Sequence, residues 1–245
     1  MTSSNGFVTS VIIYIIIIFS LLILLASFRV LSVDDFPDSS ERLDLSTIKT
    51  GDILGASYQN GLGYFIGLFL DTMWSHVGVA WRDPKTNGLF VLEAANYHDP
   101  YKGVFKIPIE NWVRFNKKNI IGLTRLTTPA GFEVNPNEVE DNFDKIRNVK
   151  LDTFNFTWWR LLFKKDYDEN YHQSHYTCYE LAVKTLQNSG VFKKRYMWSS
   201  YTPGDIMKGL VDMEDGFKYS KPTILHVGDY YNVIKSQTHD SNKGE

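Results

Sequence analysis

Hydrophobic and polar positions divide the chain into unlike parts. Residues 7–28 (FVTSVIIYIIIIFSLLILLASF) are almost entirely apolar and carry no charge, whereas residues 29–46 are polar. Residues 47–235 alternate short apolar runs with polar turns, which is the pattern of a folded domain. The last stretch, 236–245, is polar again and has no apolar pattern. We therefore predict an N-terminal flank over 1–6, an apolar helix, a polar tether, one folded domain and a polar tail.

The apolar segment is long enough to cross a membrane, because about 20 apolar residues span a hydrocarbon core of ~30 Å. A cleaved signal peptide would have a shorter apolar run, preceded by Lys or Arg and followed by a small-residue cleavage site. Here the run is longer and no Lys or Arg precedes it. We therefore predict an uncleaved, single-pass transmembrane anchor over 7–28 and a membrane localisation. Arg29, the only flanking basic residue, leaves the side of the membrane open.

Within the domain, the patterns predict strands first and helices later. Apolar runs bounded by turn residues predict strands over Ile53–Ala56, His76–Trp81, Leu89–Ala94, Lys102–Ile109 and Ile120–Leu126. Helices are predicted over Asn60–Trp74, Asn137–Val149, Tyr176–Gly190 and Thr202–Leu210. The polar turn 82–88 predicts that the second and third strands form a hairpin. A sheet followed by helices indicates an α+β fold.

Composition narrows the function classes. The chain has 245 residues and a formal net charge of −2, so it lacks the basic footprint of a nucleic-acid-binding protein, and no nucleic-acid partner is expected. Aromatic residues make up 15% of the chain, which argues against disorder. The single cysteine excludes a disulfide framework. That cysteine is therefore either a buried hydrophobic residue or a working thiol.

The cysteine lies where a helix is predicted to begin. Thr177 and Glu180 fit a capping box, and Gly190 fits the end of the same helix. Cys178 is then the first helical residue, where unpaired N–H groups and the helix dipole favour a thiolate. Its amide N–H could form half of an oxyanion hole. The alternative is a buried cysteine that fills a gap in the core.

A histidine and a glutamate are predicted to meet across the hairpin. His76 opens its strand, and the small residues Gly78 and Ala80 leave room on that face for another element, such as a helix N-terminus. His76 should lie across from about residues 93–95, a window that contains Glu93. A carboxylate in an apolar strand is costly without a partner, and an imidazole would provide one. The alternative is a glutamate on the solvated side of the sheet.

The order His76, Glu93, Cys178 resembles the circularly permuted branch of the NlpC superfamily of papain-like cysteine hydrolases. In this branch the His-bearing sheet precedes the Cys-bearing helix. The resemblance covers roughly residues 48–210, and it is closer to the YiiX-like hydrolases than to lecithin:retinol acyltransferase. Five short segments carry it: TGDILGA (50–56), SHVGVAW (75–81), FVLEA (90–94), YTCYELAVKTL (176–186) and YTPGDIM (201–207).

The resemblance implies a permuted papain-like domain with an antiparallel sheet followed by the Cys-bearing helix. It implies Cys178 as nucleophile, His76 as base and Glu93 as the residue that orients the imidazole. Tyr176 and Tyr179 are candidates for oxyanion or substrate contacts. The expected function is a membrane-anchored cysteine hydrolase or acyltransferase that cleaves an amide, peptide or acyl-ester bond through a thioester. Its substrate would be a peptide, an amide or a lipid acyl group, with no cofactor or metal.

Two other functions fit parts of the sequence. A domain of the same fold could be a catalytically inactive, membrane-anchored binding module, because fold does not imply function. The spacing of His172, His175 and Cys178 could instead place three zinc ligands on one side of a helix. Against this zinc site, the capping box starts the helix after His175, and His76 and Glu93 would have no role.

Overall fold

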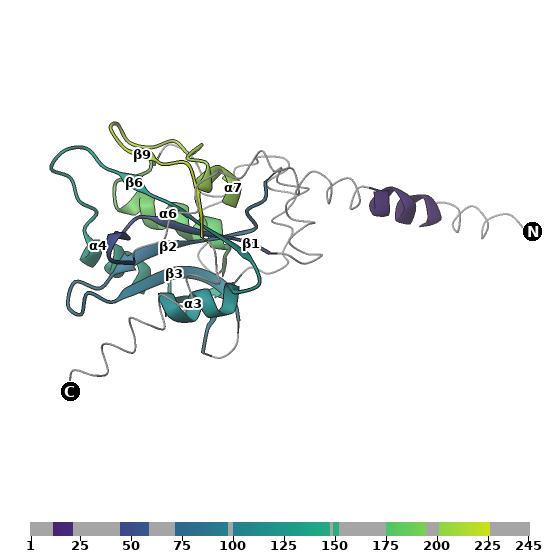
Figure 1. Cartoon of the computed structure of the whole chain (residues 1–245), viewed down its shortest axis with the longest axis horizontal. Helices are drawn as coiled ribbons and strands as arrows, with labels where there is room; N and C mark the ends of the chain where they lie inside the picture. Colours follow the sequence, from purple (N-terminus) through teal and green to yellow (C-terminus); the bar gives the residue numbers. More distant parts are fainter. Residues whose placement is uncertain are drawn as a thin grey trace, which may run out of the picture.

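The fold is described by a computed structural model of the chain. It describes residues 12–21, 45–58, 72–97, 100–147, 149–151, 175–194 and 201–225. In this part of the chain, strands form a central antiparallel sheet with helices on both of its faces (Figure 1).

Six strands pair in the order β10-β5-β1-β2-β3-β4, and every neighbouring pair is antiparallel. They are β1 (Ile53–Ser57), β2 (His76–Arg82), β3 (Leu89–Asn96), β4 (Lys102–Pro108), β5 (Ile120–Thr124) and β10 (Thr223–Leu225). Two short pairs flank the sheet, namely β6 (Leu126–Thr127) with β9 (Lys218–Tyr219) and β7 (Lys150–Leu151) with β8 (His175–Tyr176). The five predicted strands are confirmed, with ends that move by one or two residues.

The described helices of the domain are η2 (Leu45–Thr47), α3 (Ile109–Asn116), α4 (Pro136–Asp144), α6 (Cys178–Asn188) and α7 (Pro203–Met207). The last three confirm predicted helices. Helix α3 was not predicted, because the sequence analysis ended a strand at Ile109, where this helix begins. The predicted helix over Asn60–Trp74 lies outside the described residues except for 72–74, which are not helical.

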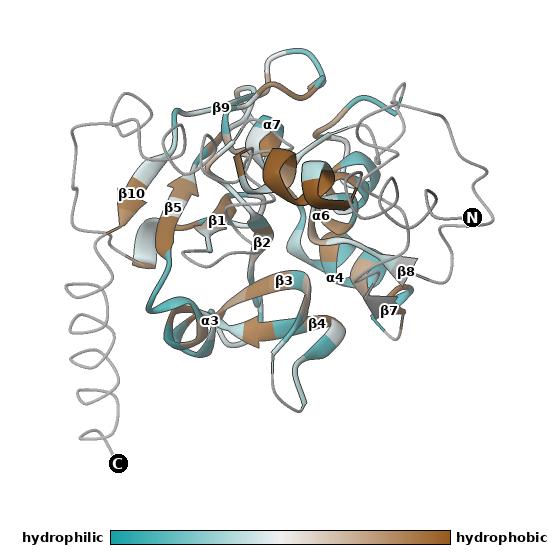
Figure 2. Ribbon diagram, turned by 90° about the vertical axis from the view of Figure 1, so that its right-hand side faces the viewer, coloured by the Kyte–Doolittle hydropathy of each residue, from teal (hydrophilic) through white to brown (hydrophobic). Residues whose placement is uncertain are grey.

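The sheet is buried on both faces. From β2, Val77 and Val79 pack in one core with Leu181 of α6, whereas Ala80 packs in a second core with Trp112 of α3. Helices α4 and α7 also contribute to the first core. Because the two cores lie on different faces, α6 and α3 lie on opposite sides of the sheet (Figure 2). Burial on both faces accounts for strands that are continuously apolar rather than alternating.

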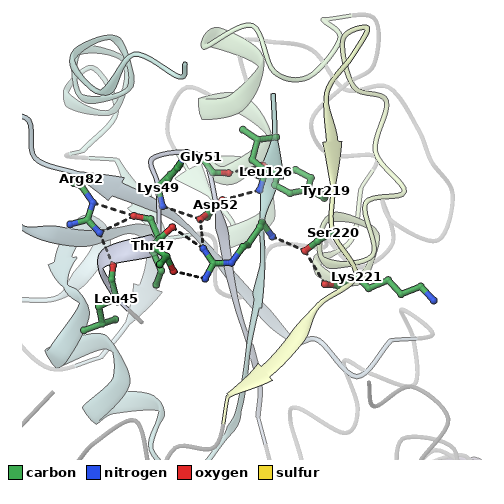
Figure 3. Close-up of polar contacts among 12 residues, drawn as sticks. Leu45, Thr47, Lys49, Gly51, Asp52, Arg82, Leu126, Tyr219, Ser220 and Lys221 are labelled. Carbon is green, nitrogen blue, oxygen red and sulfur yellow. Dashed lines mark hydrogen bonds and ion pairs between the residues drawn. The ribbon is translucent and has the colours of Figure 1, made fainter. Parts of the chain in front are cut away.

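The predicted hairpin of β2 and β3 is confirmed. In its turn Asn87 adopts a positive φ of 58°, and its backbone N–H donates to the carbonyl of Asp83. Arg82 closes β2 and donates to the carbonyl of Leu45 (Figure 3) and to the carbonyls of Ile48 and Asn87. One guanidinium therefore joins the hairpin to the segment that precedes β1.

A buried aspartate joins the turn before β1 to β6 (Figure 3). Asp52 accepts from the backbone N–H of Lys49 at 2.9 Å and from that of Leu126 at 2.8 Å, and Arg125 lies 3.8 Å from its carboxylate. Burial raises the pKa of Asp52, although both hydrogen bonds and the charge of Arg125 act to lower it. This carboxylate therefore has a structural role.

Two facing glycines receive the ring of Trp74. Gly55 of β1 lies directly opposite Gly122 of β5. A Cβ at Gly122 would lie 2.9 Å from both Cζ2 and Cζ3 of Trp74, and a Cβ at Gly55 would lie 3.0 Å from Cε3. The indole therefore packs on bare backbone. Because Trp74 is two residues before His76, this contact fixes the start of β2.

The predicted fold class is correct only in part. The domain is α+β with an antiparallel sheet, but the transmembrane helix predicted over 7–28 is wrong. The described N-terminal helix covers residues 12–21, all of them exposed, and the rest of 7–28 lies outside the described residues. Among the residues that the structure describes, no helix has the length and apolar character to cross a membrane.

The single-pass membrane localisation rested on that helix and is wrong as well. The predicted flank (1–6) and tail (236–245) lie outside the described residues. Of the predicted tether, 29–46, only the last two residues are described, as the start of η2. The domain boundaries remain predictions.

Candidate active site

A buried His–Glu pair lies at the start of the β2–β3 hairpin. Nε2 of His76 lies 2.5 Å from Oε2 of Glu93, and the two residues are 4% and 0% exposed. In the strand register, Val79 lies opposite Leu92, so Glu93 lies beside Gly78 and reaches His76 diagonally. The structure therefore brings together the two residues that the hairpin pattern selected. Their catalytic role remains a prediction.

The small residues of β2 leave room for neighbouring elements. A Cβ at Gly78 would meet Cγ1 of Val91 and would lie 3.4 Å from Cβ of Glu93. Ala80 belongs to the core that Trp112 of α3 shares. Other elements fill this space, as expected: β3 and α3 occupy it, whereas the body of α6 packs on the opposite face.

One oxygen of the Glu93 carboxylate receives all of its described hydrogen bonds. The indole Nε1–H of Trp112 donates to Oε2 at 2.9 Å, and the hydroxyl of Tyr97 donates to the same oxygen at 3.4 Å. Oε1 has no hydrogen-bond partner among the described residues. Several donors that converge on one oxygen suit an ionised carboxylate.

A chain of hydroxyl and amide groups continues from Glu93 back to the imidazole. Nδ2 of Asn116 donates to the hydroxyl of Tyr97 at 3.0 Å, and the hydroxyls of Tyr97 and Tyr58 are hydrogen-bonded to each other. The ring of Tyr58 stacks on His76, with centroids 5.6 Å apart and an interplanar angle of 16°. Burial raises the pKa of Tyr58 and of Tyr97, so both hydroxyls keep their protons at neutral pH.

The surroundings of His76 favour its protonated form. Burial alone would lower the pKa of His76, but Tyr58, Cys178 and the hydrogen bonds to Cys178 and Glu93 act in the other direction and raise it well above its usual value. Because Tyr58 is neutral at neutral pH, Cys178 and Glu93 are the partners that matter there. Nε2 is engaged with Glu93, so Nδ1 is the ring nitrogen left for the thiol.

Cys178 is the first residue of α6, as predicted, and it is half-buried. Both halves of the capping box are present, because Thr177 Oγ1 accepts from the Glu180 N–H, and Glu180 Oε2 accepts from the Thr177 N–H at 2.9 Å. Gly190 follows the helix with a φ of 70°, which fits the predicted stop. The amide N–H of a first helical residue has no acceptor within its own helix.

The remaining predicted site residues lie elsewhere. Tyr176 and Tyr179 are 1% and 5% exposed and belong to the core on the α6 side of the sheet. For the zinc alternative, His172 and the side chain of His175 lie outside the described residues. Within the described part of the chain, no cluster of three His, Cys, Asp or Glu side chains could hold a metal ion.

The sequence analysis missed four residues that surround the pair, namely Tyr58, Tyr97, Trp112 and Asn116. Only Tyr97 carried a readable signal. Tyr97 follows Glu93 by four residues, which in a strand places both side chains on one face. Trp112 and Asn116 are also four residues apart, but that spacing has meaning only on a helix.

No protein-family model matches the chain, and no curated protein matches it. A solved structure, the metalloprotein YiiX from Escherichia coli O157:H7 (DUF1105), is similar at a TM-score of 0.42 and 18% identity. The alignment covers 58% of this chain and 66% of that one, so the chain spans just under two thirds of the length of YiiX. This distant similarity agrees only loosely with a YiiX-like fold and does not establish the permuted NlpC-type assignment.

Proposed function

We propose that this domain is a thiol hydrolase or acyltransferase with the permuted NlpC-type order of His76, Glu93 and Cys178. The observation that carries the proposal is the buried His76–Glu93 pair, which occupies Nε2 and leaves the other ring nitrogen for the proposed contact with Cys178, the one cysteine of the chain. A base with a fixed tautomer beside a nucleophile at a helix start is the arrangement that activates a thiol.

In the proposed reaction, the thiol of Cys178 gives its proton to Nδ1 of His76. The sulfur attacks the carbonyl carbon of an amide, peptide or acyl ester, and the π electrons move onto the carbonyl oxygen. When the tetrahedral intermediate collapses, the C–N or C–O bond breaks and the imidazolium returns the proton to the leaving group. The acyl group remains on sulfur as a thioester.

The second half of the reaction restores the enzyme. His76 removes a proton from water, which attacks the thioester and releases a carboxylic acid, and the proton returns to sulfur. An amine or hydroxyl acceptor in place of water would make the same site a transferase. The amide N–H of Cys178 would donate to the oxyanion in both halves, because the helix provides no acceptor for it.

Thiol labelling tests the proposal directly, because any iodoacetamide adduct must lie on Cys178. At pH 7, His76→Ala should label at least about tenfold more slowly than the wild type, since the base is lost. Glu93→Gln should cause a smaller decrease. Glu140→Gln makes the same chemical change at a partly exposed glutamate paired with Lys106, and it should label at the wild-type rate.

Substrate class is tested with nitrophenyl esters of increasing acyl length and with peptide nitroanilides. Turnover of either series should disappear in Cys178→Ser and in His76→Ala. A Cys178→Ser variant that keeps most of its turnover would refute the nucleophile assignment. A wild-type thiol that labels slowly and independently of His76 would instead favour the binding module of the same fold.

A further inference from the structure

Helix α3 presents two buried polar side chains to the candidate active site from the side of the sheet opposite α6. Trp112 and Asn116 are four residues apart, so they lie on one face of the helix, and both are 0% exposed. Trp112 contacts the Glu93 carboxylate directly, and Asn116 contacts it through Tyr97. Buried tryptophan and asparagine side chains need hydrogen-bond partners for their N–H groups. Here the partners are Glu93 for Trp112 and Tyr97 for Asn116.

We propose that Trp112 is a positioning residue for the His76–Glu93 pair, an inference that rests on the proposed function. A carboxylate can rotate and can offer either oxygen to an imidazole. The indole N–H binds the same oxygen that His76 contacts and so holds the carboxylate in one rotamer. With Glu93 fixed, the proton of the neutral imidazole stays on Nε2, which faces Glu93. The other nitrogen, Nδ1, then remains available to Cys178.

The polar groups around Tyr97 complete this arrangement. Its hydroxyl has one proton and two lone pairs. It donates to Glu93 and accepts from Asn116. The Tyr58 ring stacks on His76, so Tyr58 and Glu93 both contact the imidazole. Tyr97 is the weaker of the two donors to Glu93, since its distance is 3.4 Å against 2.9 Å for Trp112.

A pair of tryptophan variants of the full chain separates positioning from packing. Trp112→Phe removes the N–H and keeps an aromatic ring. Trp81→Phe is the matched control, because Trp81 is 1% exposed and its Nε1–H donates to the carbonyl of Pro136 at 2.8 Å, on the other face of the sheet. Both variants should lose similar thermal stability. Only Trp112→Phe should slow iodoacetamide labelling of Cys178, by about 10- to 100-fold.

The ring nitrogens of His76 give a second readout that lost packing alone would not change. In ¹⁵N spectra of the imidazoles, the His76 signal is identified by its absence in His76→Ala. The wild type and Trp81→Phe should show a protonated Nε2 and an unprotonated Nδ1 above the titration of the ring. Trp112→Phe should shift both nitrogens toward a mixture of tautomers. Labelling and tautomer signals equal to those of Trp81→Phe would overturn the inference.

If Trp112→Phe does not fold, Tyr97→Phe carries the test. It should slow labelling by about 2- to 10-fold, the effect of one hydrogen bond, whereas Tyr219→Phe, which loses a bond to the Gly51 carbonyl, should not. Labelling unchanged in Tyr97→Phe would then reject positioning from α3. If His76→Ala labels like the wild type, the proposed function itself fails. If His76→Ala is slow while the α3 variant behaves like its control, only the present inference fails.

Discussion

Gly122→Ala places a methyl group inside the space occupied by the indole of Trp74. The new Cβ would lie 2.9 Å from Cζ2 and from Cζ3, and closer still to Cη2, whereas carbon atoms in contact prefer about 3.5–4.0 Å. The ring must therefore withdraw by about 1 Å or more. Trp74 is only 1% exposed, so there is little free space into which it can withdraw.

The expected cost is that of overpacking a core, about 1–3 kcal/mol of unfolding free energy. The gain of up to ~1 kcal/mol from a less flexible unfolded chain offsets it only in part. For a domain of this size, each kcal/mol of net loss lowers Tm by about 2–4 °C. Thermal unfolding of the full chain followed by circular dichroism measures it.

Two further variants sharpen the measurement. Gly88→Ala makes the same change in the hairpin turn, where the new Cβ would meet the side chains of Phe90 and Thr86 at 3.1 and 3.2 Å, and it should alter stability by less than about 0.5 kcal/mol. Adding Trp74→Phe to Gly122→Ala should cost less than Trp74→Phe alone, because the smaller ring relieves the overlap. A Gly122→Ala protein that melts within about 1 °C of the wild type would refute the packing described for Trp74.

Three other predictions concern stability. Asp52→Asn replaces one acceptor oxygen by an NH₂ group, which leaves the N–H of Lys49 or Leu126 unpaired. Urea unfolding should therefore show a loss of about 1–3 kcal/mol in unfolding free energy, and an unchanged midpoint would contradict this. Because the pKa of His76 is raised in the folded protein, its contribution to stability is complete below about pH 6.5 and is lost as pH rises through the folded value. His76→Gln should therefore flatten the dependence of Tm on pH between 5 and 9, and a variant that keeps the wild-type slope would exclude this cause. Thr177→Val should cost about 0.5–2 kcal/mol in chemical denaturation through the lost cap, whereas Thr177→Ser should stay near the wild type; equal losses would argue against the capping box.

Features encoded within a few residues of one another could be predicted from the sequence. Alternating apolar residues and the polar turn 82–88 identified the hairpin, and the spacing of Thr177 and Glu180 identified both the start of α6 and the position of Cys178. Glu93 was recognised because a carboxylate in an apolar strand needs a partner. Each of these signals is local, so it is visible before the fold is known.

Features that depend on which distant segments pack together could not be predicted. Helix α3 follows Pro108 without a side-chain cap, so its start has no local marker and its residues were read as the end of a strand. Trp112 acquires a partner only when α3 packs against β3. The apolar composition of residues 7–28 predicted a membrane-spanning helix, and no such helix is present among the described residues.

The hairpin that holds His76 and Glu93 divides the proposed reaction centre into an early and a late part of the chain. The two residues are 17 positions apart, whereas His76 and Cys178 are 102 apart by subtraction of their numbers. Closing the longer loop costs about 1.6 kcal/mol more in chain entropy. A fragment that ends before α6 would carry the base and its carboxylate with no thiol, and α6 alone would carry the thiol with no base. In the proposed mechanism an activated thiol would thus be a property of the assembled domain, and unfolding would remove it.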